Sequence, residues 1–242
     1  MVVESKDIQL LSKIPDISDP DLYEEITPVD SHFVRLRDGE FFDVKMQYPL
    51  MGMENAIEEC YVRQEVFDKL KTAQSLLPKG LKLRILDTWR PFALQEELYK
   101  KYSQSIIKTL KLEDADPETR EKVIAKYVSM PQKNRSLPAV HTTGGAVDLT
   151  LIYDNGRKLD MGSDFDDMTP KSKTNYYEIH NENPTARDNR RILYNCMTKA
   201  GFTNLPSEWW HYDFGNRFWA YYKKTPAMYT GVFDSGEGIF DK

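Results

Sequence analysis

Two short segments of the chain hold the residues best suited to chemistry. The first, "HTTGGAVDLTL" (141–151), places His141 next to a Gly-Gly pair and Asp148 inside an apolar run. The whole chain has only four histidines. A buried histidine or aspartate is costly unless it is paired or bound to a metal ion. Asp148, which stands between Val147 and Leu149, therefore needs a partner from elsewhere in the chain.

The second segment, "SEWWHYDF" (207–214), supplies that partner. Glu208 and His211 are three residues apart, so a helical turn or a kinked strand would place both on one side. His141, Asp148 and His211 together offer two imidazoles and a carboxylate, which zinc accepts as three ligands with the fourth position left to water. Bound zinc makes hydroxide available at neutral pH. Glu208, near the metal but not bound to it, is then the candidate base that passes the water's proton to the leaving amine.

The backbone between the first two ligands has to bend. His141 and Asp148 are seven residues apart, so on a regular strand their side chains would point to opposite faces. Gly144 and Gly145 allow a bend or bulge that brings the two together. The alternative is structural: His141 caps a turn, Asp148 pairs with an arginine, and "EWWH" is aromatic core.

A third segment, "DTWRPF" (87–92), places Arg90 where a strand gives way to a helix. Side chains at such a junction are held on a rigid scaffold and often belong to a site. A fixed guanidinium there would stabilise the oxyanion of a tetrahedral intermediate or bind a substrate carboxylate. The alternative is a surface arginine paired with Asp87.

A fourth segment, "LDMGSDFDDM" (159–168), contains four aspartates around Gly162. It lacks the spacing and the closing glutamate of an EF-hand calcium loop. It is therefore either an ordinary acidic loop or a source of negative charge that receives the free ammonium group of a substrate.

The composition excludes some classes of function. The 242 residues carry a net charge of −5, which argues against nucleic acid or an anionic membrane as the partner. No apolar run is long enough for a membrane span. The N-terminus does not resemble a secretory signal, so we expect a cytoplasmic protein. Cys60 and Cys196 are expected to be buried free thiols, as in a reducing compartment.

Strands and helices alternate along the chain, and a "DNG" turn at 154–156 indicates a hairpin. The class they predict is α+β. Residues 1–40 are expected to form an irregular N-terminal arm, and residues 41–242 a single domain with a C-terminal arm. The patterns predict strands at 41–50, 81–89, 146–154 and 208–215, and helices at 63–77, 91–110, 117–130 and 186–200.

Taken together, "HTTGGAVDLTL", "LDMGSDFD", "DTWRP" and "EWWHYDF" resemble the zinc D-alanyl-D-alanine dipeptidases of the glycopeptide-resistance type. These belong with the D-Ala-D-Ala carboxypeptidases and share a fold with the hedgehog signalling domain. The resemblance extends from about residue 40 to 215. It implies a small antiparallel sheet with helices packed around it, and a zinc ion in a cleft on the sheet.

The resemblance also implies a role for each residue singled out above. It implies that His141, Asp148 and His211 are the zinc ligands and that Glu208 is the general base and acid. It also implies that Arg90 stabilises the transition state and that Asp166 receives the amino terminus of the dipeptide.

The chain departs from the resistance enzymes at two positions. A serine that contacts substrate in those enzymes is replaced by Ala139. A tyrosine that helps to hold the amino terminus would fall near Met46, although Tyr48 is close enough to take its place. Each missing hydrogen-bond partner in a buried pocket costs about 1–3 kcal/mol. The resemblance therefore supports the reaction of the resistance enzymes more strongly than it supports their substrate.

The sequence predicts a zinc dipeptidase that hydrolyses a small dipeptide, most simply D-Ala-D-Ala, without nucleic acid or membrane as partner. One alternative is a zinc D,D-carboxypeptidase or endopeptidase that acts on cell-wall peptides, whose cleft must admit a longer chain. The other is a zinc-binding module without catalysis, and the presence of Glu208 counts against it.

Overall fold

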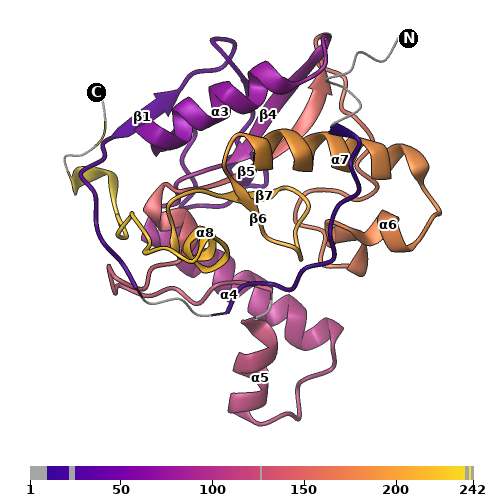
Figure 1. The fold of residues 1–242 in the computed structure, drawn as a ribbon. Coiled ribbons are helices and arrows are strands. Elements are labelled where there is room, and N and C mark those ends of the chain that lie inside the picture. The colour runs from indigo at the N-terminus through magenta and orange to yellow at the C-terminus, as the bar shows by residue number, and fades with distance from the viewer. Residues whose placement is uncertain (1–9, 22–24, 126, 238–239, 241–242) are drawn as a thin grey trace.

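A five-stranded mixed sheet forms the centre of the computed structural model, which describes residues 10–21, 25–125, 127–237 and 240 (Figure 1). Its strands run in the order β2 (Asp43–Val44), β4 (Leu81–Asp87), β5 (Ala146–Tyr153), β7 (His211–Asp213) and β6 (Thr203–Asn204). All neighbours are antiparallel except β2 and β4, which are parallel. The predicted α+β class is confirmed, and the antiparallel sheet needs this one correction at its edge. A separate two-stranded sheet pairs β1 (Phe33–Leu36) with β3 (Cys60–Arg63).

Helices lie on both sides of this sheet (Figure 1). The α-helices of the described residues are α2 (Gln47–Leu50), α3 (Gln64–Leu76), α4 (Phe92–Thr109), α5 (Pro117–Ile124), α6 (Tyr176–Ile179), α7 (Pro184–Lys199) and α8 (Arg217–Lys223). Three 3-10 turns are η1 (Val140–Thr143), η2 (Pro170–Ser172) and η3 (Ser235–Glu237). Helices α3 and α7 pack against each other over one face of the sheet, while α4 and α5 project from the other side.

The alternation of side chains along β5 separates the core from the site. Val147, Leu149 and Leu151 are fully buried against α3 and α7. Because neighbouring residues of a strand point to opposite faces, Asp148 and Thr150 lie on the other face. Burial of the apolar face contributes roughly 1.5–3 kcal/mol for each large side chain, and this fixes the register of the strand. The core therefore determines where Asp148 points.

Several predicted elements differ from the observed ones. Residues 41–50 contain the short strand β2 and the helix α2 instead of one strand, because Pro49 lies in the first turn of a helix, where proline is tolerated. The helix expected at 117–130 ends at Ile124. In the segment 208–215 only β7 is a strand, and the residues before it form a turn.

The expected N-terminal arm is ordered where it is described. Its hydrogen bonds join it to α7 and α8, and in Figure 1 its indigo trace passes α7 and α6. It is not irregular throughout, because β1 lies within residues 1–40. Its treatment as a part separate from residues 41–242 stays a prediction.

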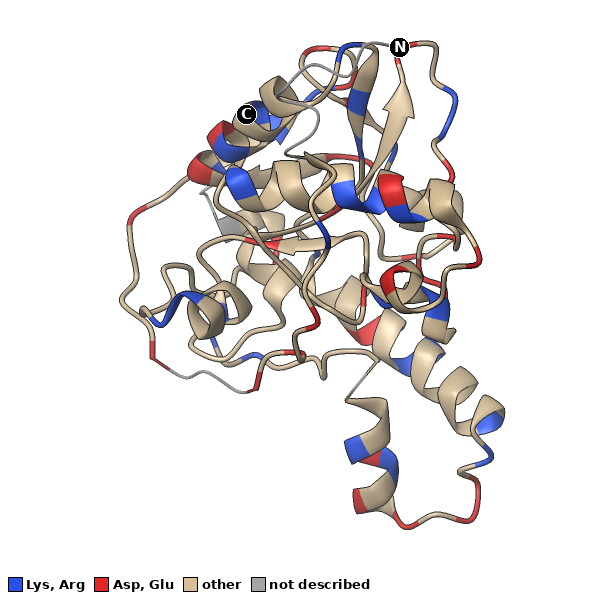
Figure 2. Cartoon of the chain, turned by 45° about the vertical axis from the view of Figure 1, so that its right-hand side comes forward, with Lys and Arg blue, Asp and Glu red and all other residues tan. Residues whose placement is uncertain are grey.

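The helices carry charges of both signs (Figure 2), and both cysteines are free. Basic and acidic residues are interspersed along the helices (Figure 2). Cys60 in β3 and Cys196 in α7 are free and buried, as expected. Among the described residues, no helix has the length and apolar character that crossing a bilayer requires.

Candidate metal centre and active site

Three buried side chains meet at one point, as the sequence predicts. One nitrogen or oxygen atom from each of His141, Asp148 and His211 lies within 4.8 Å of the others. His141 Nε2 is 3.2 Å from His211 Nδ1, and His211 Nδ1 is 2.9 Å from Asp148 Oδ1. Tetrahedral ligands about 2.0–2.1 Å from a zinc ion are roughly 3.3 Å from one another. Two imidazoles and a carboxylate at this spacing therefore fit a single zinc ion.

The strand pairing brings these ligands together. Asp148 on β5 lies directly opposite His211 on β7 and opposite Asp87 on β4. His141 is not on the strand but in the 3-10 turn η1, which ends at Gly144 with φ +73°. A Cβ atom at Gly144 would lie 2.3 Å from Phe33 Cε1. Gly144 thus provides the left-handed turn that the spacing of His141 and Asp148 requires.

The outer ring nitrogens of both histidines are also held. His141 Nδ1 is 2.7 Å from the carbonyl oxygen of Thr88, and His211 Nε2 is 3.0 Å from Asp213 Oδ1. Asn216 Nδ2 donates to the same Asp213 oxygen at 2.5 Å. These partners orient each ring so that its other nitrogen faces Asp148. Burial lowers the pKa of His211, but Asp213 and Asp148 raise it, and the net pKa lies well above its usual value.

We expect the replacement of Asp213 by alanine to weaken zinc binding by about 10–100-fold, because removal of an outer partner frees the ring that it orients. The measurement is the zinc dissociation constant from competition with a chelator. Asp154→Ala, which removes an exposed acid at the far end of β5, is the control. An unchanged dissociation constant in a folded Asp213→Ala variant would show that His211 is not held through this contact.

Glu208 lies beside the ligands because of a tight turn. Its amide donates to the carbonyl oxygen of Leu205, and its own carbonyl accepts from the amide of His211. The turn places Glu208 Oε2 3.8 Å from His211 Nδ1. Burial raises the pKa of the Glu208 carboxyl to about 8. A carboxyl group with a pKa near the working pH is suited to accept and return a proton.

Arg90 is buried beside the metal ligands and does not lie on the surface. Its Nε donates to Asp87 at 2.5 Å, and its Nη2 donates to Asp148 at 3.2 Å and to the Tyr48 hydroxyl at 3.1 Å. The ion pair with Asp87, which was the alternative role for Arg90, is therefore present. The same ion pair also holds the guanidinium so that it faces the metal ligands. Burial opposes the charge, yet Tyr48, Asp87 and Asp148 raise the pKa of Arg90 well above its usual value.

The sequence departs from the resistance enzymes at two positions, Ala139 and the region near Met46. Tyr48 is 2% exposed and faces Arg90, whereas Met46 packs in the hydrophobic core. Tyr48 therefore lines the space beside the ligands, and Met46 does not. That Tyr48 helps to hold the amino terminus of the substrate stays a prediction. Ala139 also lines the cleft, but its methyl group can neither donate nor accept a hydrogen bond.

Asp166 stands apart from the other acids of its loop. It adopts a left-handed conformation with φ 59°, which aspartate tolerates better than most residues. Tyr102 on α4 donates a hydrogen bond of 2.5 Å to Asp166 Oδ2. Burial raises the pKa of this carboxyl, in part against the hydrogen bond from Tyr102. Asp160, by contrast, accepts from the amide of Gly162 and from Asn183.

The six predicted residues gather at one cleft, and of these only Asp148 does not line it. Its volume is about 480 Å³, and we call it the metal chamber. Five of the predicted residues line it directly: Arg90, His141, Asp166, Glu208 and His211. Asp148 lies beneath them and contacts Arg90 and His211.

Three partners were missed by sequence reasoning. Asp213 had a usable signal, since residues i and i+2 of a strand share a face and His211 precedes it by two. Tyr102 gave no signal, because its position on α4 becomes relevant only when the helix is docked. Gln95, which is 2% exposed and 3.4 Å from Arg90 Nη1, was missed for the same reason.

Comparisons with known proteins show the family of the chain. A D-alanyl-D-alanine dipeptidase from Synechocystis sp. is 29% identical over 72% of this chain and 77% of its own length. One from Escherichia coli is 30% identical over 64% of this chain and 66% of its own length. A solved structure described as VanYB in complex with D-Alanine-D-Alanine covers 78% of the chain and 88% of its own length. It has 14% identity and a TM-score of 0.39. The sequence profile of the D-Ala-D-Ala dipeptidase family matches residues 51–229, and the chain therefore belongs to this peptidase family.

Proposed function

We propose that the protein is a zinc-dependent dipeptidase that hydrolyses D-alanyl-D-alanine. The observation that carries this proposal is the position of Glu208, whose Oε2 lies 3.8 Å from His211 Nδ1, beside three buried ligands that fit one zinc ion. Membership in the family and the names of the two relatives support the reaction and the substrate.

The residues then have distinct roles. Zinc held by His141, Asp148 and His211 would polarise the peptide carbonyl and lower the pKa of a water molecule. Glu208 would take a proton from a water molecule as the water oxygen bonds to the carbonyl carbon. It would then deliver the proton to the nitrogen of the breaking C–N bond, so that the first alanine gains a carboxylate and the second leaves as an amine. Arg90 places its guanidinium where negative charge develops on the carbonyl oxygen.

Asp166 is proposed to receive the ammonium group of the substrate. It lies on the same cleft as Glu208, and its left-handed backbone turns its carboxyl toward Tyr102 and the cleft. Backbone strain of this kind is found where a site requires one particular orientation.

We expect Asp166→Ala to lower kcat/KM for D-Ala-D-Ala by about 10–100-fold, because a buried ammonium group would lose its charged partner. The measurement is the steady-state rate with D-Ala-D-Ala and with its N-acetylated form, which carries no ammonium. The matched control is Asp164→Ala, an acid of the same loop that lies outside the metal chamber.

The same experiment separates the proposal from the carboxypeptidase alternative. An enzyme for longer peptides has no free amine to bind at this point, so Asp166→Ala would leave its rate nearly unchanged. If the protein cleaves the N-acetylated peptide as fast as the free dipeptide, the dipeptidase assignment is wrong. The cytoplasmic location expected from the N-terminus stays a prediction.

A further inference from the structure

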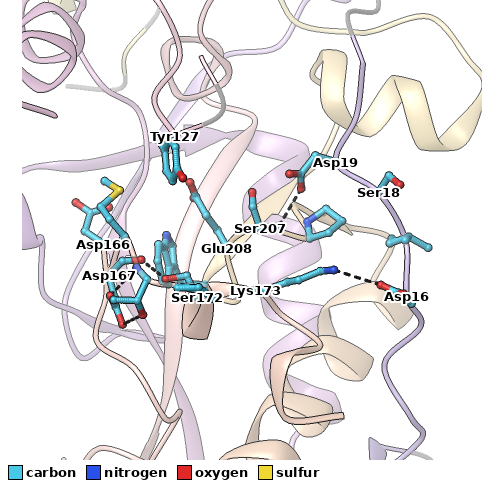
Figure 3. A pocket seen from close by; sticks show the side chains of 16 residues that line it. Asp16, Ser18, Asp19, Tyr127, Asp166, Asp167, Ser172, Lys173, Ser207 and Glu208 are labelled. Carbon is cyan, nitrogen blue, oxygen red and sulfur yellow. Dashed lines mark hydrogen bonds and ion pairs between the residues drawn. The ribbon is translucent and has the colours of Figure 1, made fainter. Parts of the chain in front are cut away.

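A second chamber, whose lining side chains are drawn in Figure 3, lies beside the metal chamber. Its volume is about 590 Å³, and it shares walls with the metal chamber at Asp19, Asp166 and Glu208. Cavities of roughly 300–1,000 Å³ hold small-molecule ligands. The side chain of alanine is a single methyl group, so D-Ala-D-Ala would leave most of this second chamber unused.

The N-terminal arm forms the outer wall of the second chamber. In Figure 3, Asp16, Ser18 and Asp19 lie on the arm, across the chamber from Asp166. Asp19 Oδ1 accepts from the amide of Ser207 at 2.9 Å, directly before Glu208. The Ser18 carbonyl accepts from the Tyr222 hydroxyl at 2.7 Å. The arm lies outside residues 51–229, so the family profile assigns no role to this wall.

The wall of the second chamber is rich in acid. Its described lining carries five carboxyl groups and a single cationic side chain: Asp16, Asp19, Asp166, Asp167 and Glu208, with Lys173. Lys173 Nζ lies 3.4 Å from Asp16 Oδ1, so the arm partly neutralises this cation. Glu208 exchanges a proton in the proposed reaction, so the charge rests on the other four carboxyl groups, which still outnumber the single cation of the described lining. A concave surface lined mainly by one sign of charge concentrates ligands of the opposite sign.

We propose that the second chamber is a subsite for the side chain of the amino-terminal residue of the substrate, and that it prefers a side chain ending in an ammonium group. This inference rests on the proposed function, in which Asp166 receives the amino terminus. Asp166 lines both chambers, so a long side chain on the residue held there reaches the space between the arm and the 166–173 loop.

The test compares three dipeptides that share D-Ala at the carboxyl end and carry D-Ala, D-norleucine or D-lysine at the amino end. Norleucine reproduces the aliphatic stem of lysine without its ammonium group. We expect kcat/KM for D-Lys-D-Ala to exceed that for D-Nle-D-Ala by about fivefold at low ionic strength, with a smaller ratio at high salt. The lysine-to-norleucine ratio isolates charge from size.

Two variants should move this ratio in opposite directions. Asp19→Asn keeps an oxygen that can accept from Ser207 but removes a negative charge, so the ratio should fall by about two- to threefold. Lys173→Met removes the single cation, so the ratio should rise. Asp21→Asn is the control, because it makes the same change on the arm outside both chambers and should leave the ratio unchanged.

The outcomes separate the two proposals. If the protein hydrolyses D-Ala-D-Ala but shows no preference for lysine over norleucine, the subsite is refuted and the dipeptidase assignment stands. A purely structural role of the arm would lower both rates together and leave the ratio constant, which also refutes the subsite. An equal shift in Asp21→Asn refutes it as well, since the effect would then be one of net charge. If no dipeptide is hydrolysed, both proposals fall.

Discussion

Replacing Glu208 by glutamine is expected to lower kcat for D-Ala-D-Ala by about 10³-fold while zinc remains bound, since a positioned acid–base group contributes roughly 10²–10⁴-fold. Glutamine has nearly the same shape but cannot take a proton from water or deliver one to the leaving amine. Its effect should therefore appear in kcat far more than in KM.

The measurement pairs the steady-state rate with the zinc content of the same purified sample. Glu121→Gln, a substitution of an exposed glutamate on α5, is the control and should leave both values unchanged. A Glu208→Gln enzyme that retains zinc and hydrolyses the dipeptide at the normal rate would remove Glu208 from the mechanism. It would also favour a zinc-binding module without catalysis.

The second large effect is expected at Arg90. We expect Arg90→Lys to lower kcat by about 10²–10³-fold, the range seen when one donor to a developing oxyanion is lost. Lysine keeps the positive charge but lacks the planar fork with which Arg90 contacts Asp87, Tyr48 and Asp148 together. The lysine variant is preferable to alanine, because alanine would leave the buried Asp87 without a cation, at a cost of about 3–5 kcal/mol.

A matched arginine on β4 controls for the loss of a buried ion pair. Arg84 is also buried and donates to Asp43 at 2.5 Å, but it lies outside the metal chamber. Arg84→Lys should lower the unfolding temperature without changing kcat. If Arg90→Lys lowers kcat no more than Arg84→Lys does, Arg90 acts only as part of the scaffold.

Periodicity and turn chemistry predicted the central elements correctly. The strand predicted at 81–89 contains β4, and the helix predicted at 63–77 contains α3. In both elements the regularly spaced apolar side chains are buried in the core, so the packing agrees with the sequence pattern. The ligand triad could also be predicted, because glycine at 144 and 145 explains how His141 and Asp148 converge.

Other features depend on docking between distant segments and leave no local pattern. Tyr102 reaches Asp166 only because α4 packs beside the acidic loop. Asp19 reaches Ser207 across 188 positions of sequence. The sequence predicts a strand where the turn before β7 lies, since the aromatic residues of this turn also favour strands. Only the packing of the turn decides between the two.

The most direct test of the zinc site is a crystal structure of the zinc-loaded protein with data collected at the zinc absorption edge. We expect one anomalous peak per chain within bonding distance of His141 Nε2, Asp148 and His211 Nδ1, with Glu208 beside the ion but not bound to it. A zinc-supplemented crystal with no peak there, or a structure that holds the imidazoles of His141 and His211 apart, would contradict the account.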